Sequence, residues 1–171
     1  MRKTITFFVS VVFYLAAFSQ RPCTDPAHRQ FDFWIGEWEA YGLNGQKAGD
    51  SKISLILDSC IILEEWTSTS MNCGIRYAGK SYNTYNATRQ KWQQYWVDNA
   101  GGVTEYFNGH YKDGEMIVQT DNIKQQDGTF KILKMTFYNL SPDKVRQHGE
   151  SSADDGKTWK TDFDLEYRRK K

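Results

Sequence analysis

The segment Phe31-Asp32-Phe33-Trp34-Ile35-Gly36-Glu37-Trp38-Glu39 places a Gly-x-Trp sequence at the start of the first predicted strand of this 171-residue chain. After it, apolar and polar residues alternate in short runs between turn signals such as Asn44-Gly45, where both residues tolerate positive φ. The same region has no helical period of useful length. Nine turns between hydrophobic runs predict ten strands. The predicted strands are residues 32–42, 47–57, 60–69, 75–86, 91–98, 103–111, 115–122, 129–140, 144–152 and 158–168.

The last predicted strand shows the alternation most clearly, because aromatic, leucine or threonine residues alternate with charged ones along it. One face is therefore expected to be buried and the other solvated. Only short turns join the strands, which favours an antiparallel up-and-down meander, and closure would remove its two edges. The sequence thus predicts an all-β barrel of about ten antiparallel strands over residues 32–171. The face expected to be buried carries Trp159, Thr161, Phe163, Leu165 and Tyr167.

Residues 1–19 are predicted to be a signal peptide. Arg2 and Lys3 give a positively charged n-region, and residues 5–18 are mostly apolar. Ala17-Phe18-Ser19 then supplies small residues at the positions that a signal peptidase recognises. The apolar run is shorter than the about 20 residues that a membrane span needs. Cleavage is therefore favoured over an uncleaved anchor, and the protein is expected to be secreted or periplasmic.

The mature chain would begin with an N-terminal segment, residues 20–31, and carry almost no net charge. Cys23 follows Gln20-Arg21-Pro22 rather than small residues, which argues against a lipoprotein. The whole chain has 22 basic and 21 acidic residues, so loss of the two basic residues in the signal leaves 20 against 21, a formal charge of −1. No basic excess recruits nucleic acid or anionic lipid, so neither is expected as a partner. The sequence does not fix the oligomeric state.

The strand layout predicts one disulfide among the three cysteines. Cys23 precedes the first predicted strand and Cys60 follows the second, so both lie at the same end of the barrel. Cys73 lies one strand further on, roughly 30 Å from Cys60 at about 3.3 Å per residue. A disulfide needs Cα atoms within about 7 Å. We therefore expect a Cys23–Cys60 disulfide, which the oxidising compartment of an exported protein permits, and an unpaired Cys73.

Residues 152–159 match Ser-x-Asp-x-Gly-x-Thr-Trp, the Asp-box. Asp154 can cap turn amides, Gly156 can take positive φ, and Trp159 is expected to re-enter the core. The motif resembles the repeated turn of sialidase propellers, but this chain has one copy and lacks the length for six blades. We interpret it as a structural turn.

Gly36-Glu37-Trp38 resembles the Gly-x-Trp sequence of lipocalins and their calycin relatives. In those barrels a basic residue of the last strand packs over the tryptophan. Arg168 and Arg169 lie where either could make this cation–π contact with Trp34 or Trp38. The expected role of these residues is structural.

The wider pattern resembles an exported bacterial family, domain of unknown function 1579, over nearly all of the mature chain. The resemblance implies a lipocalin-like barrel. The family has no established activity, so no catalytic residues are transferred, and Cys73 departs from its pattern. The matching features are residues 31–38, Cys60 with Glu64-Glu65-Trp66, Gly79-x-Ser81-x-Asn83-x-Tyr85, residues 92–99 with Gly101, the Asp-box, and Tyr167-Arg168-Arg169-Lys170.

Polar and aromatic residues share faces on three neighbouring predicted strands. If these faces point inward, polar groups in a dry core would cost free energy unless they were paired. A cavity that holds a small, partly apolar ligand explains them; pairing with one another, or an outward face, are the alternatives. The residues expected to bind the ligand are Glu64 as the charged anchor, Trp66, Ser81, Asn83, Gln94 and Trp96.

Two other function classes remain open. A cofactor-free isomerase or hydrolase could use Glu64 in the same cavity, and a raised pKa of Glu64 would favour it. An interaction module would have a filled core and an exposed aromatic patch. No cofactor or catalytic residue is predicted. No metal site is predicted either, because the three histidines lack metal-ligand spacing. His148 is similar in place to the haem-holding histidine of nitrobindin-type barrels, but Arg146 and Glu150 share its face, which is expected to be solvated.

Overall fold

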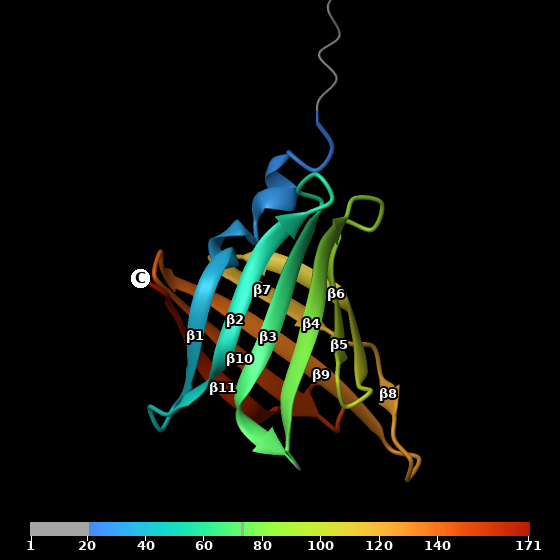
Figure 1. The fold of residues 1–171 in the computed structure, drawn as a ribbon. Coiled ribbons are helices and arrows are strands. Elements are labelled where there is room, and N and C mark those ends of the chain that lie inside the picture. Colours follow the sequence, from blue (N-terminus) through green and yellow to red (C-terminus); the bar gives the residue numbers. More distant parts are fainter. Residues whose placement is uncertain (1–20, 73) are drawn as a thin grey trace, which may run out of the picture.

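Ten antiparallel strands close into a barrel in the computed structural model, which describes residues 21–72 and 74–171 (Figure 1). The ten barrel strands pair in the order in which they follow along the chain, and the last pairs with the first, which completes the circle. The predicted fold class is therefore confirmed. The elements are the 3-10 turns η1 (Pro26–Arg29) and η2 (Asp32–Trp34) and the strands β1 (Gly36–Gly42), β2 (Lys47–Ile56), β3 (Ile61–Asn72), β4 (Ile75–Asn86), β5 (Lys91–Asp98), β6 (Val103–Lys112), β7 (Glu115–Gln119), β8 (Ile123–Lys124), β9 (Phe130–Ser141), β10 (Lys144–Ser152) and β11 (Lys160–Arg169).

The two ends of the barrel differ. The closed end carries η1, η2 and the turns at residues 57–60, 87–90 and 141–143; the open end carries the turns at residues 43–46 and 99–102, among others. Figure 1 shows the N-terminal segment over the closed end, at the top of the view. The predictions for residues 1–19 and for Cys73 lie outside the described residues.

Several strand boundaries differ from the predictions by a few residues, and two of the differences have a structural cause. Residues 32–34 form the 3-10 turn η2 instead of the start of a strand, because the amides of Trp34 and Ile35 donate to the carbonyls of Phe31 and Asp32. The turn places the side chain of Trp34 inside the closed end of the barrel. The predicted strand at residues 115–122 ends at Gln119, and the short strand β8 follows and pairs only with β9.

The predicted face of the last strand is wrong at its first two positions. The β10–β11 register shifts at Gly149, which pairs with Phe163, while the next residue, Glu150, pairs with Thr161. This bulge turns Thr161 outward to the ring of His148, 3.0 Å away. Trp159 does not re-enter the core: it lies partly exposed with the ammonium of Lys134 4.0 Å from its ring centroid. Phe163, Leu165 and Tyr167 keep the predicted inward face.

Aromatic residues of the N-terminal segment fill the closed end. Trp34 has ring centroids 5.0 Å from Phe31 and 4.6 Å from Phe137 of β9, and all three side chains are fully buried. The indole nitrogen of Trp38 donates to the carbonyl of Trp34 at 2.8 Å. These contacts fix the turn η2 against the first strand. Buried aromatic side chains of this size contribute much of a core's stability.

A disulfide bond and an arginine side chain hold the N-terminal segment and the start of β1 in place. Cys23 and Cys60 form the predicted disulfide, with Cα atoms 5.0 Å apart. Of the two candidate arginines, Arg169 lies over Trp38 at 4.1 Å from the ring, and also donates to the carbonyl of Ile35 at 3.0 Å. Arg168 instead lies over Tyr41, 4.2 Å from its ring. The Gly-x-Trp contact expected from lipocalins is thus present through Arg169.

The turn at residues 152–159 is built as the Asp-box predicts. The carboxylate of Asp154 accepts from the amide and the hydroxyl of Thr158 at 2.8 and 2.6 Å, and from Ser152. These hydrogen bonds lower the pKa of Asp154 to about 2. Gly156 has a φ of 79°, which its lack of a side chain permits. The motif therefore has a structural role at the open end.

Candidate ligand-binding cavity

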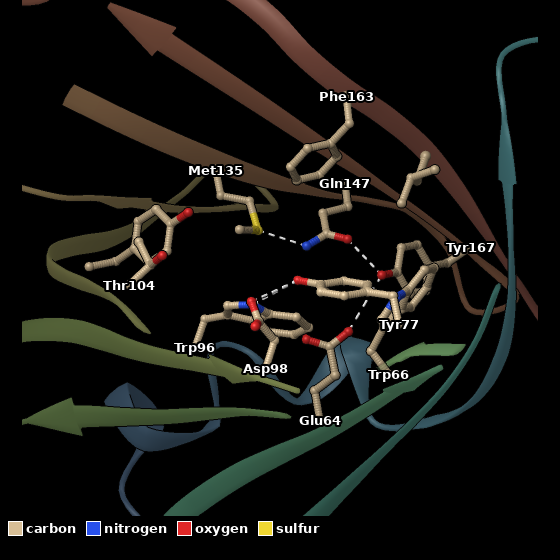
Figure 2. A pocket seen from close by; sticks show the side chains of 12 residues that line it. Glu64, Trp66, Tyr77, Trp96, Asp98, Thr104, Met135, Gln147, Phe163 and Tyr167 are labelled. Carbon is tan, nitrogen blue, oxygen red and sulfur yellow. Dashed lines mark hydrogen bonds between the residues drawn. The ribbon is translucent and has the colours of Figure 1, made fainter. Parts of the chain in front are cut away.

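A cavity of about 380 Å³ occupies the half of the barrel that faces the open end (Figure 2). Its floor is buried and its mouth is not: Glu64 and Tyr167 are 2% and 1% exposed, whereas Phe163 is 38% exposed. The barrel is therefore filled at one end and hollow at the other. The lining residues are Glu64, Trp66, Tyr77, Trp96, Asp98, Thr104, Tyr106, Met135, Gln147, Phe163, Leu165 and Tyr167.

Glycines in the strands let large rings lie flat against the wall. A Cβ atom built on any of three strand glycines would overlap an aromatic ring from a neighbouring strand. Because the rings occupy the space of the missing side chains, they line the cavity instead of filling it. The pairs are Gly49 with Trp66, Gly79 with Trp96, and Gly149 with Phe163.

The floor of the cavity is the carboxyl group of Glu64. Ser51 of β2 donates to one of its oxygens and Ser81 of β4 to the other, both at 2.9 Å. The hydroxyl of Tyr167 lies 3.5 Å from Glu64 but 2.6 Å from the side-chain oxygen of Gln147. Since a tyrosine has one proton to donate, the shorter contact identifies Gln147 as its acceptor. Glu64 is thus supported chiefly by the two serine hydroxyls.

A row of buried amides orients the donors toward Glu64. Gln94 donates to the side-chain oxygen of Asn83 at 2.7 Å, and Asn83 donates to the hydroxyl oxygen of Ser81 at 2.9 Å. The proton of Ser81 is then directed at Glu64, because its oxygen already accepts. The side-chain oxygen of Gln94 finds no partner among the described residues. The network makes Glu64 an acceptor.

Burial dominates the ionisation of this group. It raises the pKa of Glu64 to about 7, against the opposing effect of the hydrogen bonds from the two serines. The pKa of Tyr167 is raised well above its usual value by burial and by the neighbouring Glu64. Glu64 therefore changes its protonation near neutral pH, while Tyr167 stays neutral.

A second carboxylate, Asp98, lies at the mouth. Tyr77 and the indole nitrogen of Trp96 donate to one oxygen at 3.0 and 3.2 Å, and the amides of Ala100 and Gly102 donate to the other. Partial burial alone would raise the pKa of Asp98, but these hydrogen bonds hold it below its usual value. Asp98 is thus ionised at neutral pH and fixes the rings of Tyr77 and Trp96.

The structure brings together all six side chains predicted to bind a ligand, but in two groups. Glu64, Trp66 and Trp96 line the cavity, while the other three lie behind Glu64 in the buried hydrogen-bond network. The predicted faces point inward, as a ligand site in the barrel requires. The three polar side chains of the second group pair with one another, which was the alternative explanation for buried polar residues. Direct ligand contact stays a prediction for all six. The residues of the second group are Ser81, Asn83 and Gln94.

The sequence predicted an inward face for Tyr167 but not its place across the cavity from Glu64, and it gave no indication that Gln147 and Met135 line the cavity. Gln147 and Met135, joined by a 2.7 Å contact, and Tyr167 come from strands far along the chain that face β3–β5 only after closure. Asp98 had a signal that could have been used, since it follows Trp96 by two residues and shares its face. The strand glycines were a second such signal.

Other candidate chemistry is not assembled at this site. Among residues 21–72 and 74–171, no group of three or more His, Cys, Asp or Glu side chains could hold a metal ion. His148 lies on the outer face with Glu150, which pairs with Lys134, and Arg146, which pairs with Asp164. None of the helices in the described ranges has the length and apolar character to cross a membrane.

The protein is a closed antiparallel barrel with a cavity large enough for one small molecule, which is consistent with a lipocalin-like barrel. In comparisons with known proteins, no family model and no curated protein matches the chain. The resemblance to domain of unknown function 1579 stays a prediction. The disulfide is consistent with a secreted or periplasmic protein.

Proposed function

We propose that this protein is an exported carrier or sensor that binds one small, partly apolar molecule in the cavity. The observation that carries the proposal is the hollow itself: rings from three strands lie flat on its wall, around a buried carboxyl group. Its volume of about 380 Å³ falls within the range of about 300–1,000 Å³ typical of ligand pockets. The apolar wall would supply contact area and Glu64 would fix the orientation.

Native mass spectrometry of the protein from its own periplasm or medium tests this proposal. We expect extra mass that is lost on denaturation, and the mass of the chain itself would report whether residues 1–19 are removed. A Trp96→Leu variant should lose the extra mass, because Trp96 forms part of the wall. The matched control is Val97→Leu on the outward-facing neighbour, which should keep it. A bare wild-type protein that also binds no compound from an amine, alcohol and acid panel would refute the proposal.

A cofactor-free isomerase or hydrolase is the second candidate, and the raised pKa of Glu64 favours it. A general acid–base residue works best when its pKa lies near the working pH. In this case Glu64→Gln would abolish turnover of the carried compound while leaving its binding in place. A compound that stays chemically unchanged on prolonged incubation with the wild type, from pH 5 to 9, would exclude this candidate.

A further inference from the structure

We propose that the cavity selects a small organic cation, an amine or quaternary ammonium group on an apolar body. This inference rests on the proposed function and names the class of ligand. It is carried by the charges and rings of the wall together, because the cavity combines two carboxylates with six aromatic side chains. The aromatic residues are Trp66, Tyr77, Trp96, Tyr106, Phe163 and Tyr167.

Positive charge is missing from the cavity wall. Its two charged residues are Glu64 and Asp98, and no lysine, arginine or histidine occurs among the described residues that line it. Among the described residues, the groups within hydrogen-bonding distance of the Glu64 carboxyl group are neutral hydroxyls, those of Ser51, Ser81 and, at 3.5 Å, Tyr167. A buried carboxylate without a counter-charge is costly, so a bound cation would supply what the chain lacks. An anionic ligand would instead face two like charges.

Four donors of the wall are already engaged, whereas the indole nitrogen of Trp66 and the hydroxyls of Thr104 and Tyr106 make no hydrogen bond among the described residues. Trp96 and Tyr77 donate to Asp98, Tyr167 donates to Gln147, and the amide of Gln147 contacts the sulfur of Met135. Figure 2 shows these contacts converging on the cavity. Carboxylate oxygens and the negative faces of aromatic rings both attract cations.

Four of the rings that line the cavity are placed as two pairs. The centroids of Trp66 and Tyr167 are 6.2 Å apart, and those of Tyr77 and Trp96 are 6.4 Å apart. Close packing of the two tryptophan rings on strand glycines, together with hydrogen bonds, holds the rings in place before a ligand binds. An ammonium group near Glu64 would therefore meet preformed aromatic faces, which reduces the entropy lost on binding.

Binding of a cation should also release a proton from Glu64. The ionisable groups that face the cavity from other strands are Tyr77, Tyr106 and Tyr167, whose pKa values are raised, and Asp98, whose pKa is lowered. These four keep their charge state near neutral pH, so Glu64 alone changes. A cation favours ionised Glu64, and its affinity should rise as the pH increases through about 7.

The first experiment uses three probes of similar shape: 2-phenylethylammonium, 2-phenylethanol and phenylacetate. Calorimetric titration at pH 8 should show the amine binding at least about tenfold more tightly than the alcohol, and no binding of the acid. Glu64→Gln should remove most of the preference for the amine. The matched control is Glu65→Gln, since Glu65 lies on the opposite face and pairs with Lys80. An alcohol that binds the wild type as tightly as the amine would overturn the inference and leave the proposed function intact.

A second measurement does not depend on a folded variant. Wild-type protein is titrated with benzyltrimethylammonium, whose charge is fixed, from pH 5.5 to 8.5 in buffers of different ionisation enthalpy. Rising affinity with release of close to one proton at pH 6 supports the inference; pH-independent binding overturns it. If no probe binds, the molecule carried by the native protein decides: a cation supports the inference, a neutral or acidic molecule overturns it, and no carried molecule refutes both proposals.

Discussion

The two ends of the barrel use the same strands and the same kinds of residue for opposite purposes. At the closed end, Trp34 and Phe31 enter from the N-terminal segment and pack on Phe137 until the space is filled. At the open end, Trp66 and Trp96 come from the barrel wall and lie flat over glycines. Aromatic content alone therefore does not decide whether a barrel is solid or hollow. The difference comes from whether a second segment reaches the axis and whether the wall has room for its own rings.

The largest effect is expected from truncation at the closed end. Trp34→Ala should lower the free energy of unfolding by about 3–5 kcal/mol, because it removes a fully buried indole and leaves a cavity. Phe163→Ala at the mouth should cost about 1 kcal/mol or less, since this ring is partly exposed. Urea unfolding measures both. Equal losses would mean that the filled end and the hollow end contribute alike to stability, which would contradict the proposed difference between them.

The disulfide at the closed end should have the next largest effect. Replacing Cys23 and Cys60 together by serine frees a segment spanning 37 positions, and the loss of this constraint should cost about 3–4 kcal/mol. Ligand affinity at the open end should change little in the variant, provided that it is measured well below the unfolding midpoint. An unchanged unfolding midpoint would show that aromatic packing alone secures the segment.

Ionisation of Glu64 should make the hollow end a source of pH-dependent instability. Its folded-state pKa of about 7 lies above the ordinary value of 4.5, so the folded protein holds this proton more tightly than the unfolded chain. Its contribution is therefore most favourable below about pH 4.5 and is lost as the pH rises through 7, by about 3 kcal/mol.

The difference in stability between the wild type and Glu64→Gln isolates this contribution. Relative to the wild type, the variant should gain stability between pH 5 and 8, as measured by chemical unfolding in a buffer series. Glu65→Gln serves as the control, because Glu65 is partly exposed and its pKa is lowered by the hydrogen bond from Lys80. A parallel pH profile for the wild type and Glu64→Gln would contradict the assignment.

The sequence predicted local features better than features set by distant strands. Turn residues and period-two alternation located the ten barrel strands, and counting strands between cysteines placed Cys23 beside Cys60. Alternation failed at Thr161, because a bulge opposite Gly149 shifts the register and such a bulge has no reliable local signal. It also could not show that Gln147 and Glu64 both approach the hydroxyl of Tyr167, since that arrangement depends on how the sheet closes.

A modest loss of stability, but a large loss of function, should follow from adding a side chain to a glycine that lies under an aromatic ring at the open end. In Gly79→Ala the new methyl group would overlap the ring of Trp96 and push it toward the cavity, because the Val97 carbonyl blocks the other direction. The expected cost is about 1–2 kcal/mol, since Gly79 has no left-handed φ and only packing is disturbed.

The same displacement of Trp96 should shrink the cavity and break its 3.2 Å hydrogen bond to Asp98. Ligand affinity should then fall more than stability does, and double substitution as Gly79→Ala with Trp96→Leu should recover the stability but not the affinity. The matched control is Ala78→Gly on the outward-facing neighbour, whose effect on affinity should be negligible. If Gly79→Ala left affinity unchanged, the flat seating of the ring would be a packing detail, and the hollow would have to be maintained by the barrel's circumference alone.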